Sequence, residues 1–272
     1  MSPIEQSIKA KIEKIGTPLK DWDINIYRGV LTGFNDAFII SGEKRKEILA
    51  KCKSVDERKR TDDLIRPILR GRDIKRYSYE YADLYLIATF PAKHYDIEEY
   101  PAVKDYLLSF GMERLEQTGK EHTINGEKIK ARKKTNNKWF ETQDSISYWD
   151  EFNKPKIIWG NLNLSATYTL APAGMMINAP ATMIVPASES LLCILNSKLA
   201  DYYIRNLGVT RNGGYFEYKP MFIEQLPVPQ NIDENLFKEL SKKELDNEKE
   251  IDRKVYELYG LTKDEILFVE MM

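Results

Sequence analysis

Arginine next to glycine is the pattern in this 272-residue chain that says most about its chemistry. It occurs at Tyr27-Arg28-Gly29 and again at Arg70-Gly71-Arg72. A glycine allows a ligand to approach the backbone closely, and a neighbouring guanidinium can bind a phosphate or the acceptor edge of a guanine. The two segments therefore predict an anion-binding surface, with nucleic acid as the preferred ligand.

Contacts to a DNA backbone use cations and small polar groups but carry no sequence information. The turn at Arg70–Arg76 fits this role, and its structural alternative is a turn in which Arg72 pairs with Asp73. Beside the glycine turn Asn212-Gly213-Gly214, Arg211 is the favoured contact. The complete set of candidates for backbone contacts is Arg28, Thr32, Arg70, Gly71, Arg72, Lys75, Arg76, Lys198 and Arg211.

A second group is suited to reading bases. In the major groove Arg and Lys pair with guanine, and Asn and Gln pair with adenine. Both kinds of side chain occur in Lys120–Phe140, a polar segment with 7 basic and 2 acidic residues, which we expect to be exposed. For each residue the alternative is a solvated basic loop. The candidate base-reading residues are Lys128, Lys130, Arg132, Lys133, Lys134, Asn136, Asn137 and Lys138.

The net charge of −1 hides this basic region. Residues 231–272 carry 12 acidic and 7 basic side chains, which leaves +4 on the other 230 residues. Charge therefore weakly favours a DNA-binding body with an acidic tail. Cys52 and Cys193 are the only cysteines, and neither a signal-like segment nor a long apolar run is present, so we expect a cytoplasmic protein outside the membrane.

Catalytic patterns are weak. Glu57-Arg58-Lys59 matches only the second half of a metal-dependent nuclease motif, and His94 and His122 are too far apart for a zinc or HNH site. The Pro-Pro motif and the glycine-rich turn of an adenine methyltransferase do not occur. We therefore expect no enzyme activity and no cofactor or metal in this chain alone.

Apolar spacing predicts the elements that position these side chains, in a mixed α+β fold with mostly antiparallel strands. Leu245 is the only apolar residue in Ser241–Glu250, so the last helix is expected to be solvated or interrupted there. Expected strands lie in Ile24–Ile40 around a glycine turn and at Leu84–Phe90, Lys156–Trp159, Thr167–Leu170, Met175–Ile177 and Thr182–Val185. Expected helices are Ile4–Ile15, Glu43–Lys53, Tyr100–Gln117, Glu189 to near Gly208, and Glu234 onward.

The chain resembles the TaqI-like C-terminal specificity domain, the DNA target-recognition domain that follows the methyltransferase domain in type IIG restriction-modification enzymes. It is also similar to the recognition domains of type I specificity subunits. The departure is Lys120–Phe140, which matches no familiar pattern and lies where target-reading loops should differ. The resemblance rests on Pro18–Trp22, Tyr27–Gly29, Thr32–Phe38, Ile68–Tyr77, Lys154–Trp159, Leu195–Leu199, Glu224–Pro229 and Ile251–Leu261, in this order.

The resemblance implies a connector helix at 1–17, a recognition domain at 18–230 and a C-terminal helical segment at 231–272. It implies double-stranded DNA as ligand and methyltransferase and nuclease domains as partners. Adenine-N6 methylation with S-adenosylmethionine, and cleavage with Mg²⁺, would belong to those partners. Two alternatives stay open: a docking module that uses the terminal helices, and a cryptic nuclease that uses Glu57 and Lys59.

Overall fold

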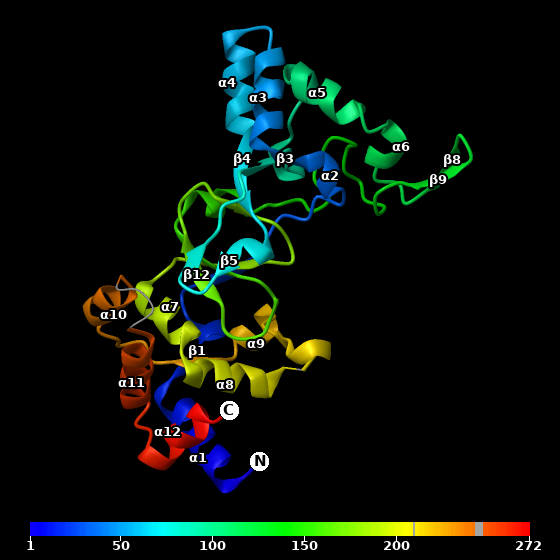
Figure 1. The fold of residues 1–272 in the computed structure, drawn as a ribbon. Helices are drawn as coiled ribbons and strands as arrows, with labels where there is room; N and C mark the ends of the chain where they lie inside the picture. The colour runs from blue at the N-terminus through cyan, green and yellow to red at the C-terminus, as the bar shows by residue number, and fades with distance from the viewer. Residues whose placement is uncertain (209, 243–246) are drawn as a thin grey trace.

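The computed structural model describes residues 1–208, 210–242 and 247–272. The molecule is elongated, with α3 to α6 at one end and both chain termini at the other (Figure 1). The expected mixed α+β fold is confirmed: the sheets are small and open, and of the strands described only β13 and β4 pair in parallel. None of the described helices has the length and apolar character needed to cross a membrane.

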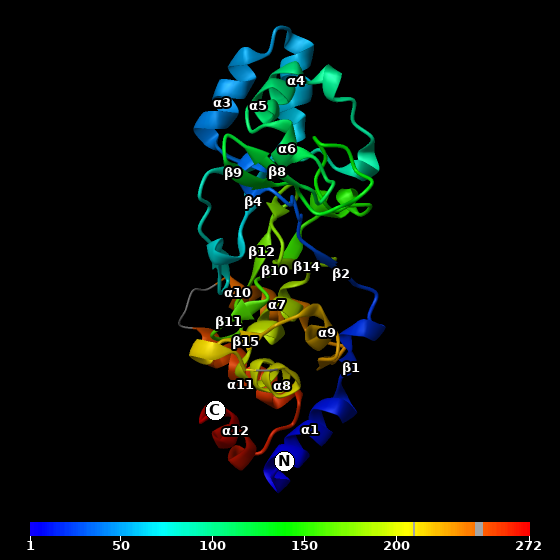
Figure 2. The same ribbon diagram turned by 90° about the vertical axis from the view of Figure 1, so that its right-hand side faces the viewer.

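A four-stranded antiparallel sheet occupies the middle of the molecule (Figure 2). Successive side chains of a strand point to opposite faces, so alternate residues enter different cores. In β10, Ile158 enters the upper hydrophobic core, whereas Ile157 and Trp159 enter the lower one. The sheet therefore joins two cores. Its strands, in spatial order, are β12 (Tyr168–Ala171), β10 (Lys156–Trp159), β14 (Thr182–Val185) and β2 (Asn25–Arg28).

The upper part is built on a second sheet and short helices. Its strands are β13 (Met176–Ile177), β4 (Ile65–Leu69), β7 (Leu84–Ile87) and β3 (Ile39–Ser41). Its helices are α2 (Asn35–Phe38), α3 (Gly42–Lys51), α4 (Val55–Leu64), α5 (Pro101–Leu108) and α6 (Met112–Leu115). The hairpins β5 (Ile74–Lys75) with β6 (Ser78–Tyr79), and β8 (Glu121–Ile124) with β9 (Glu127–Lys130), complete it.

The lower part contains both ends of the chain. Helix α1 (Pro3–Ile15), which ends at Gly16 as expected, lies beside α12 (Figure 1). The other helices here are α7 (Glu189–Asn196), α8 (Lys198–Leu207), α9 (Pro220–Ile223), α10 (Glu234–Ser241), α11 (Glu248–Leu258) and α12 (Lys263–Glu270). Two short pairs complete it: β1 (Thr17–Pro18) with β16 (Pro227–Val228), and β11 (Leu162–Asn163) with β15 (Phe216–Glu217).

Three of the expected elements are interrupted. The helix expected at Tyr100–Gln117 breaks at Gly111, whose φ of 89° is favourable only for glycine. The helix expected from Glu189 divides at Ser197, whose hydroxyl accepts from the Ala200 amide and caps α8. In Ile24–Ile40, α2 replaces part of the expected second strand. Residues 243–246, which include Leu245, lie outside the described residues, and the domain limits at 17 and 230 stay predictions.

Glu265 connects the two ends of the chain. Its carboxylate accepts from Lys11 Nζ at 2.7 Å, from the Ser7 hydroxyl at 2.7 Å and from the Thr262 amide at 2.7 Å. Burial acts to raise the pKa of this carboxyl, but these donors outweigh it and lower the pKa to about 2. The charged form of Glu265 is therefore stabilised in the folded protein.

We expect Glu265→Gln to lower the free energy of unfolding at pH 7 by roughly 2–3 kcal/mol. A carboxyl with a depressed folded-state pKa stabilises the fold above its unfolded pKa, and that stability is lost as pH falls towards the folded pKa. The difference between wild type and variant should thus shrink as pH falls from 4.5 towards 2. Urea unfolding of both proteins at pH 7 and pH 3 measures it, and Glu13→Gln on the exposed face of α1 is the control. A difference that does not depend on pH contradicts this role.

Candidate functional site

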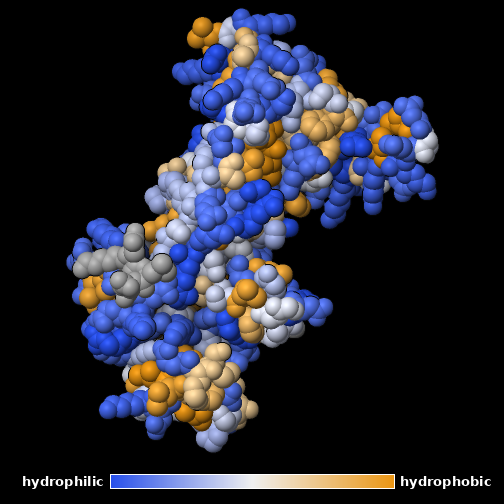
Figure 3. Space-filling model, in the orientation of Figure 1, coloured by the Kyte–Doolittle hydropathy of each residue, from blue (hydrophilic) through white to orange (hydrophobic). Residues whose placement is uncertain are grey.

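One side of the molecule is hollowed between two projections (Figure 3). The upper projection carries the β8–β9 hairpin, and the lower one contains α9 and the end of α8 (Figure 1). We call residues 121–142 the basic arm, residues 70–76 the Arg70 turn and residues 210–219 the Arg211 turn. The sequence-predicted candidates fall mainly in these three segments.

The basic arm begins as a β-hairpin, whereas an exposed polar segment without strands was expected there. Asn125 and Gly126 both have positive φ, 52° and 82°, which is the geometry of a two-residue hairpin turn. The Asn-Gly pair in the sequence is the signal for this turn. The strands and the loop after them expose cationic and amide side chains, and these exposed candidates are Lys128, Lys130, Lys133, Lys134, Asn136 and Lys138.

The exposure expected of Arg132 is wrong, because only 4% of this residue is accessible. Its guanidinium donates to the carbonyls of Leu115 (2.8 Å), Thr32 (2.7 Å), Glu141 (2.7 Å) and Trp139 (2.6 Å). Burial lowers the pKa of Arg132 to about 10, so the group still carries its charge at neutral pH. Arg132 therefore fastens the basic arm to the upper core and has no free edge for a base.

Two further candidates are turned inward. The Asn137 amide donates to the Gln143 carbonyl at 2.8 Å, so this residue closes its own loop. Thr32 is fully buried, and its hydroxyl donates to Asn35 Oδ1 at 2.6 Å and accepts from the Phe34 amide. These local hydrogen bonds occupy the Asn137 amide nitrogen and the Thr32 hydroxyl, which weakens the case for both residues as DNA contacts.

In the Arg70 turn the ion pair differs from the expected alternative. Arg70, not Arg72, pairs with Asp73, through Nε at 2.9 Å and Nη2 at 2.7 Å. Burial acts to raise the pKa of Asp73, yet the hydrogen bonds from Arg70 bring it below its usual value. This pair leaves Arg72 and Lys75 exposed. Gly71 lies against Gly160, where a Cβ would be 4.0 Å from the Gly160 Cα.

Arg76 and Lys198 contact the C-terminal helices instead of lying free on the surface. Arg76 Nε is 3.1 Å from Glu248 at the start of α11. Lys198, at the start of α8, pairs with Glu270 of α12. Both cations are thus partly neutralised within the chain, which weakens their case as phosphate contacts. Arg28 is exposed at the end of β2, and its role stays a prediction.

The Arg211 turn contains three charged side chains that lie together. Arg211 was predicted from the sequence, but Glu217 and Lys219 were not. Arg211 pairs with Glu217, and Lys219 Nζ lies 3.0 Å from the other oxygen of the same carboxylate. Hydrogen bonds from Lys219 and Arg211 hold the pKa of Glu217 below its usual value. The side chain of Arg211 is 55% exposed, whereas that of Glu217 is 7% exposed. Glu217 therefore fixes the orientation of an arginine that faces solvent.

Glu57 does not have the surroundings of a nuclease carboxylate. Its oxygens accept from the amides of Lys53 at 2.7 Å and Ala102 at 3.3 Å, so it connects α4 to α5. Within the described residues there is no group of three metal-ligating side chains. His122 Nε2 lies 2.7 Å from Glu116, so it pairs with the residue that follows α6. These contacts give Glu57 and His122 structural roles.

The fold is that of a region found in restriction enzymes. It is similar to part of the type IIG restriction endonuclease BpuSI, with a TM-score of 0.55 and 16% identity over 97% of this chain and 32% of that chain. It is also similar to the type IIL restriction-modification enzyme MmeI, solved in complex with DNA, with a TM-score of 0.60 and 11% identity over 94% of this chain and 36% of that chain. The chain thus spans about a third of each solved protein.

The sequence gives a narrower assignment. The family model of the TaqI-like C-terminal specificity domain matches residues 66–228, which is more than half of the chain. The chain therefore belongs to the TaqI-like C-terminal specificity domain family, as the resemblance implied. No curated protein matches it.

Proposed function

We propose that this chain is the DNA target-recognition domain of a type IIG restriction-modification enzyme. The observation that carries the proposal is that three segments expose cations, the basic arm, the Arg70 turn and the Arg211 turn, and that the basic arm and the Arg211 turn lie on the two projections that border one hollowed side of the molecule (Figure 1, Figure 3). Lys and Arg side chains that neutralise phosphates provide the sequence-independent part of DNA affinity. Family membership supports a role in choosing the sequence.

In this proposal the chain selects the site and partner domains do the chemistry. Those domains methylate adenine N6 with S-adenosylmethionine and cleave nearby DNA with Mg²⁺, in the cytoplasm of a prokaryotic cell. The lengths of the two solved restriction enzymes, about three times the matched region, support the existence of such domains. The present chain contributes recognition alone.

Arg211 is suited to reading a base. A phosphate contact needs mainly charge, but Glu217 neutralises much of the charge of Arg211. A guanidinium held at one side by a carboxylate presents its other edge in a fixed plane, which fits the O6 and N7 acceptors of guanine. We therefore assign Arg211 to a guanine and Arg72 and Lys75 to phosphates.

We expect Arg211→Ala to lose about 1–3 kcal/mol of discrimination at one base pair, with little change in the salt dependence of binding. Selection of duplexes from a randomised pool by wild type and variant measures the change. The recovered motifs should differ at one position only. Arg211→Lys should behave like the alanine variant, because an ammonium cannot make the paired contact.

Lys219→Ala is the matched control, since it removes a neighbouring cation from the same carboxylate. If Arg211→Ala weakens binding to every sequence equally and makes the log–log salt slope shallower by about 0.9, Arg211 contacts a phosphate instead.

Docking to a catalytic partner is the second candidate function. The end of α12 exposes Leu267 (61%) and Met271 (78%), and Figure 3 shows apolar surface at this end of the molecule. A Leu267→Glu variant that still binds DNA but no longer co-purifies with separately supplied catalytic domains would support this role.

A further inference from the structure

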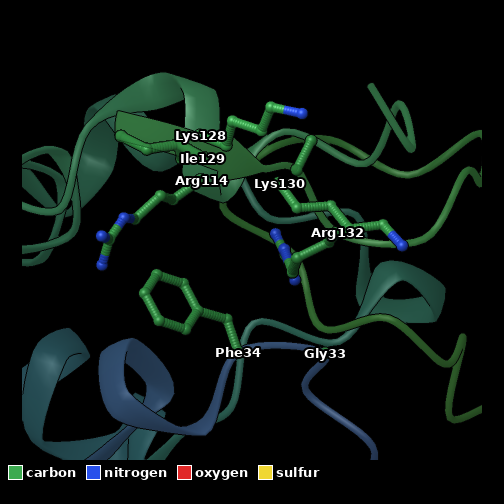
Figure 4. A pocket seen from close by; sticks show the side chains of 8 residues that line it. Gly33, Phe34, Arg114, Lys128, Ile129, Lys130 and Arg132 are labelled. Atoms are coloured by element: carbon green, nitrogen blue, oxygen red, sulfur yellow. The ribbon is translucent and has the colours of Figure 1, made fainter. Parts of the chain in front are cut away.

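A pocket lies under the basic arm, between β9, α6 and the turn before α2. It has a volume of about 290 Å³, room for roughly ten water molecules or one nucleobase. In Figure 4 the Phe34 ring faces β9 across this space, and the side chain of Arg114 extends into it from α6. Its apolar lining comes from Phe34, Ile129 and Ala131, and its cations are Arg114, Lys128, Lys130 and the buried Arg132, whose guanidinium is already bonded to backbone carbonyls.

The cations of this pocket are largely unneutralised. Among the described residues, the side chains of Arg114 and Lys130 have no hydrogen-bond or ion-pair partner. Lys128 is 3.8 Å from Glu121, with 81% and 61% of the two side chains exposed, a weak pair. No acidic residue belongs to the lining that the structure describes. The pocket therefore favours an anionic ligand.

The Phe34 ring is held in place by its neighbours. It packs edge to face on Phe110, with ring centroids 5.4 Å apart. The turn before it is fixed by Gly33 at φ 74° and by the bond from Arg132 to the Thr32 carbonyl. The positive φ at Gly33 is a backbone conformation that favours glycine, so a side chain at this position would strain the turn. The aromatic surface is thus preorganised next to the cations.

We propose that this pocket binds one unpaired nucleotide of the DNA, with its base stacked on Phe34 and its phosphate near Arg114 and Lys130. A bare phosphate would need only the cations, and an apolar group would need only the ring. A nucleotide needs both, a planar π-face next to an anion. The inference rests on the proposed function, because bound DNA supplies the nucleotide.

The test compares two short single strands of equal length and charge, an oligothymidylate and an oligomer of abasic residues. Fluorescence anisotropy with the complete chain should show about tenfold tighter binding of the oligothymidylate, as stacked bases contribute. Phe34→Leu, which keeps apolar volume but removes the π-face, should abolish most of this preference. Arg114→Gln should weaken binding of both strands.

Arg58→Gln on the exposed surface of α4 is the matched control for loss of one arginine charge, and it should leave both affinities unchanged. Equal binding of the two strands by wild type, or an unchanged preference in Phe34→Leu, would overturn the inference. Duplex DNA is titrated in parallel: if the duplex binds while these strands do not differ, only the pocket assignment fails. If the duplex does not bind either, the proposed function itself fails. Should Phe34→Leu not fold, the wild-type comparison of the two strands still tests the contribution of the bases, and Arg114→Gln tests the phosphate contact.

Discussion

Replacing Arg132 with alanine is expected to lower the free energy of unfolding by about 3 kcal/mol or more. The change removes four hydrogen bonds and leaves the carbonyls of Thr32, Leu115 and Trp139 without this donor, whereas the Glu141 carbonyl keeps its bond from Gln117. The basic arm would then lose its attachment to the upper core. Because Arg132 has no free edge for a base, the variant should weaken binding to all duplexes rather than change the preferred base at one position.

Urea unfolding measures the stability of this variant, and duplex selection measures its specificity. Lys133→Ala is the neighbouring control, since Lys133 is exposed and its loss should leave the free energy of unfolding within about 0.5 kcal/mol. If Arg132→Ala is as stable as wild type but reads one base pair less strictly, the structural role given to this guanidinium is wrong.

Replacing Lys128, Lys130, Lys133 and Lys134 together with glutamine should greatly weaken binding to any duplex without unfolding the protein. All four residues are exposed, so their side chains add little to the core. Removing one cation from a phosphate makes the log–log salt slope shallower by about 0.9, so removing all four changes the slope by up to about 3.6. Titration of one duplex at several salt concentrations measures this slope.

A variant with the same change in net charge separates local contacts from overall charge. Lys46, Lys51, Lys53 and Lys59 are exposed on or beside α3 and α4, away from the β8–β9 hairpin in Figure 1. Their replacement with glutamine should leave the salt slope close to that of wild type. If the two sets of four replacements change the salt slope equally, the cations of the basic arm do not contact the DNA and act only through the net charge of the protein.

Local spacing was sufficient to predict much of the fold. The four strands of the central sheet lie in segments whose apolar residues and flanking Pro and Gly indicated strands, and α1 follows from its isoleucines. The breaks at Gly111 and Ser197 were not predicted, because the apolar face continues past both residues and only the backbone conformation or the cap shows the interruption.

The candidate site was predicted less well, because a sequence does not show which cations are buried. Arg132 lies in a run with Lys133 and Lys134, yet only Arg132 turns inward. Lys156 is a second example: it is fully buried and its ammonium donates to the carbonyls of Phe152, Pro172 and Met175 at 3.0 to 3.1 Å. A sequence does not show which backbone carbonyls will accept hydrogen bonds from a lysine or arginine side chain. Arg114 was missed because it lies inside Tyr100–Gln117, which was expected to be one continuous helix.

Selection of bound duplexes from a randomised DNA pool by this chain, at low and moderate salt, tests the central claim most directly. A target-recognition domain should enrich one short motif and should lose affinity steeply as salt rises. Failure to retain duplex DNA at low salt, or retention with no motif at any salt concentration, would contradict the claim that this chain chooses the DNA sequence.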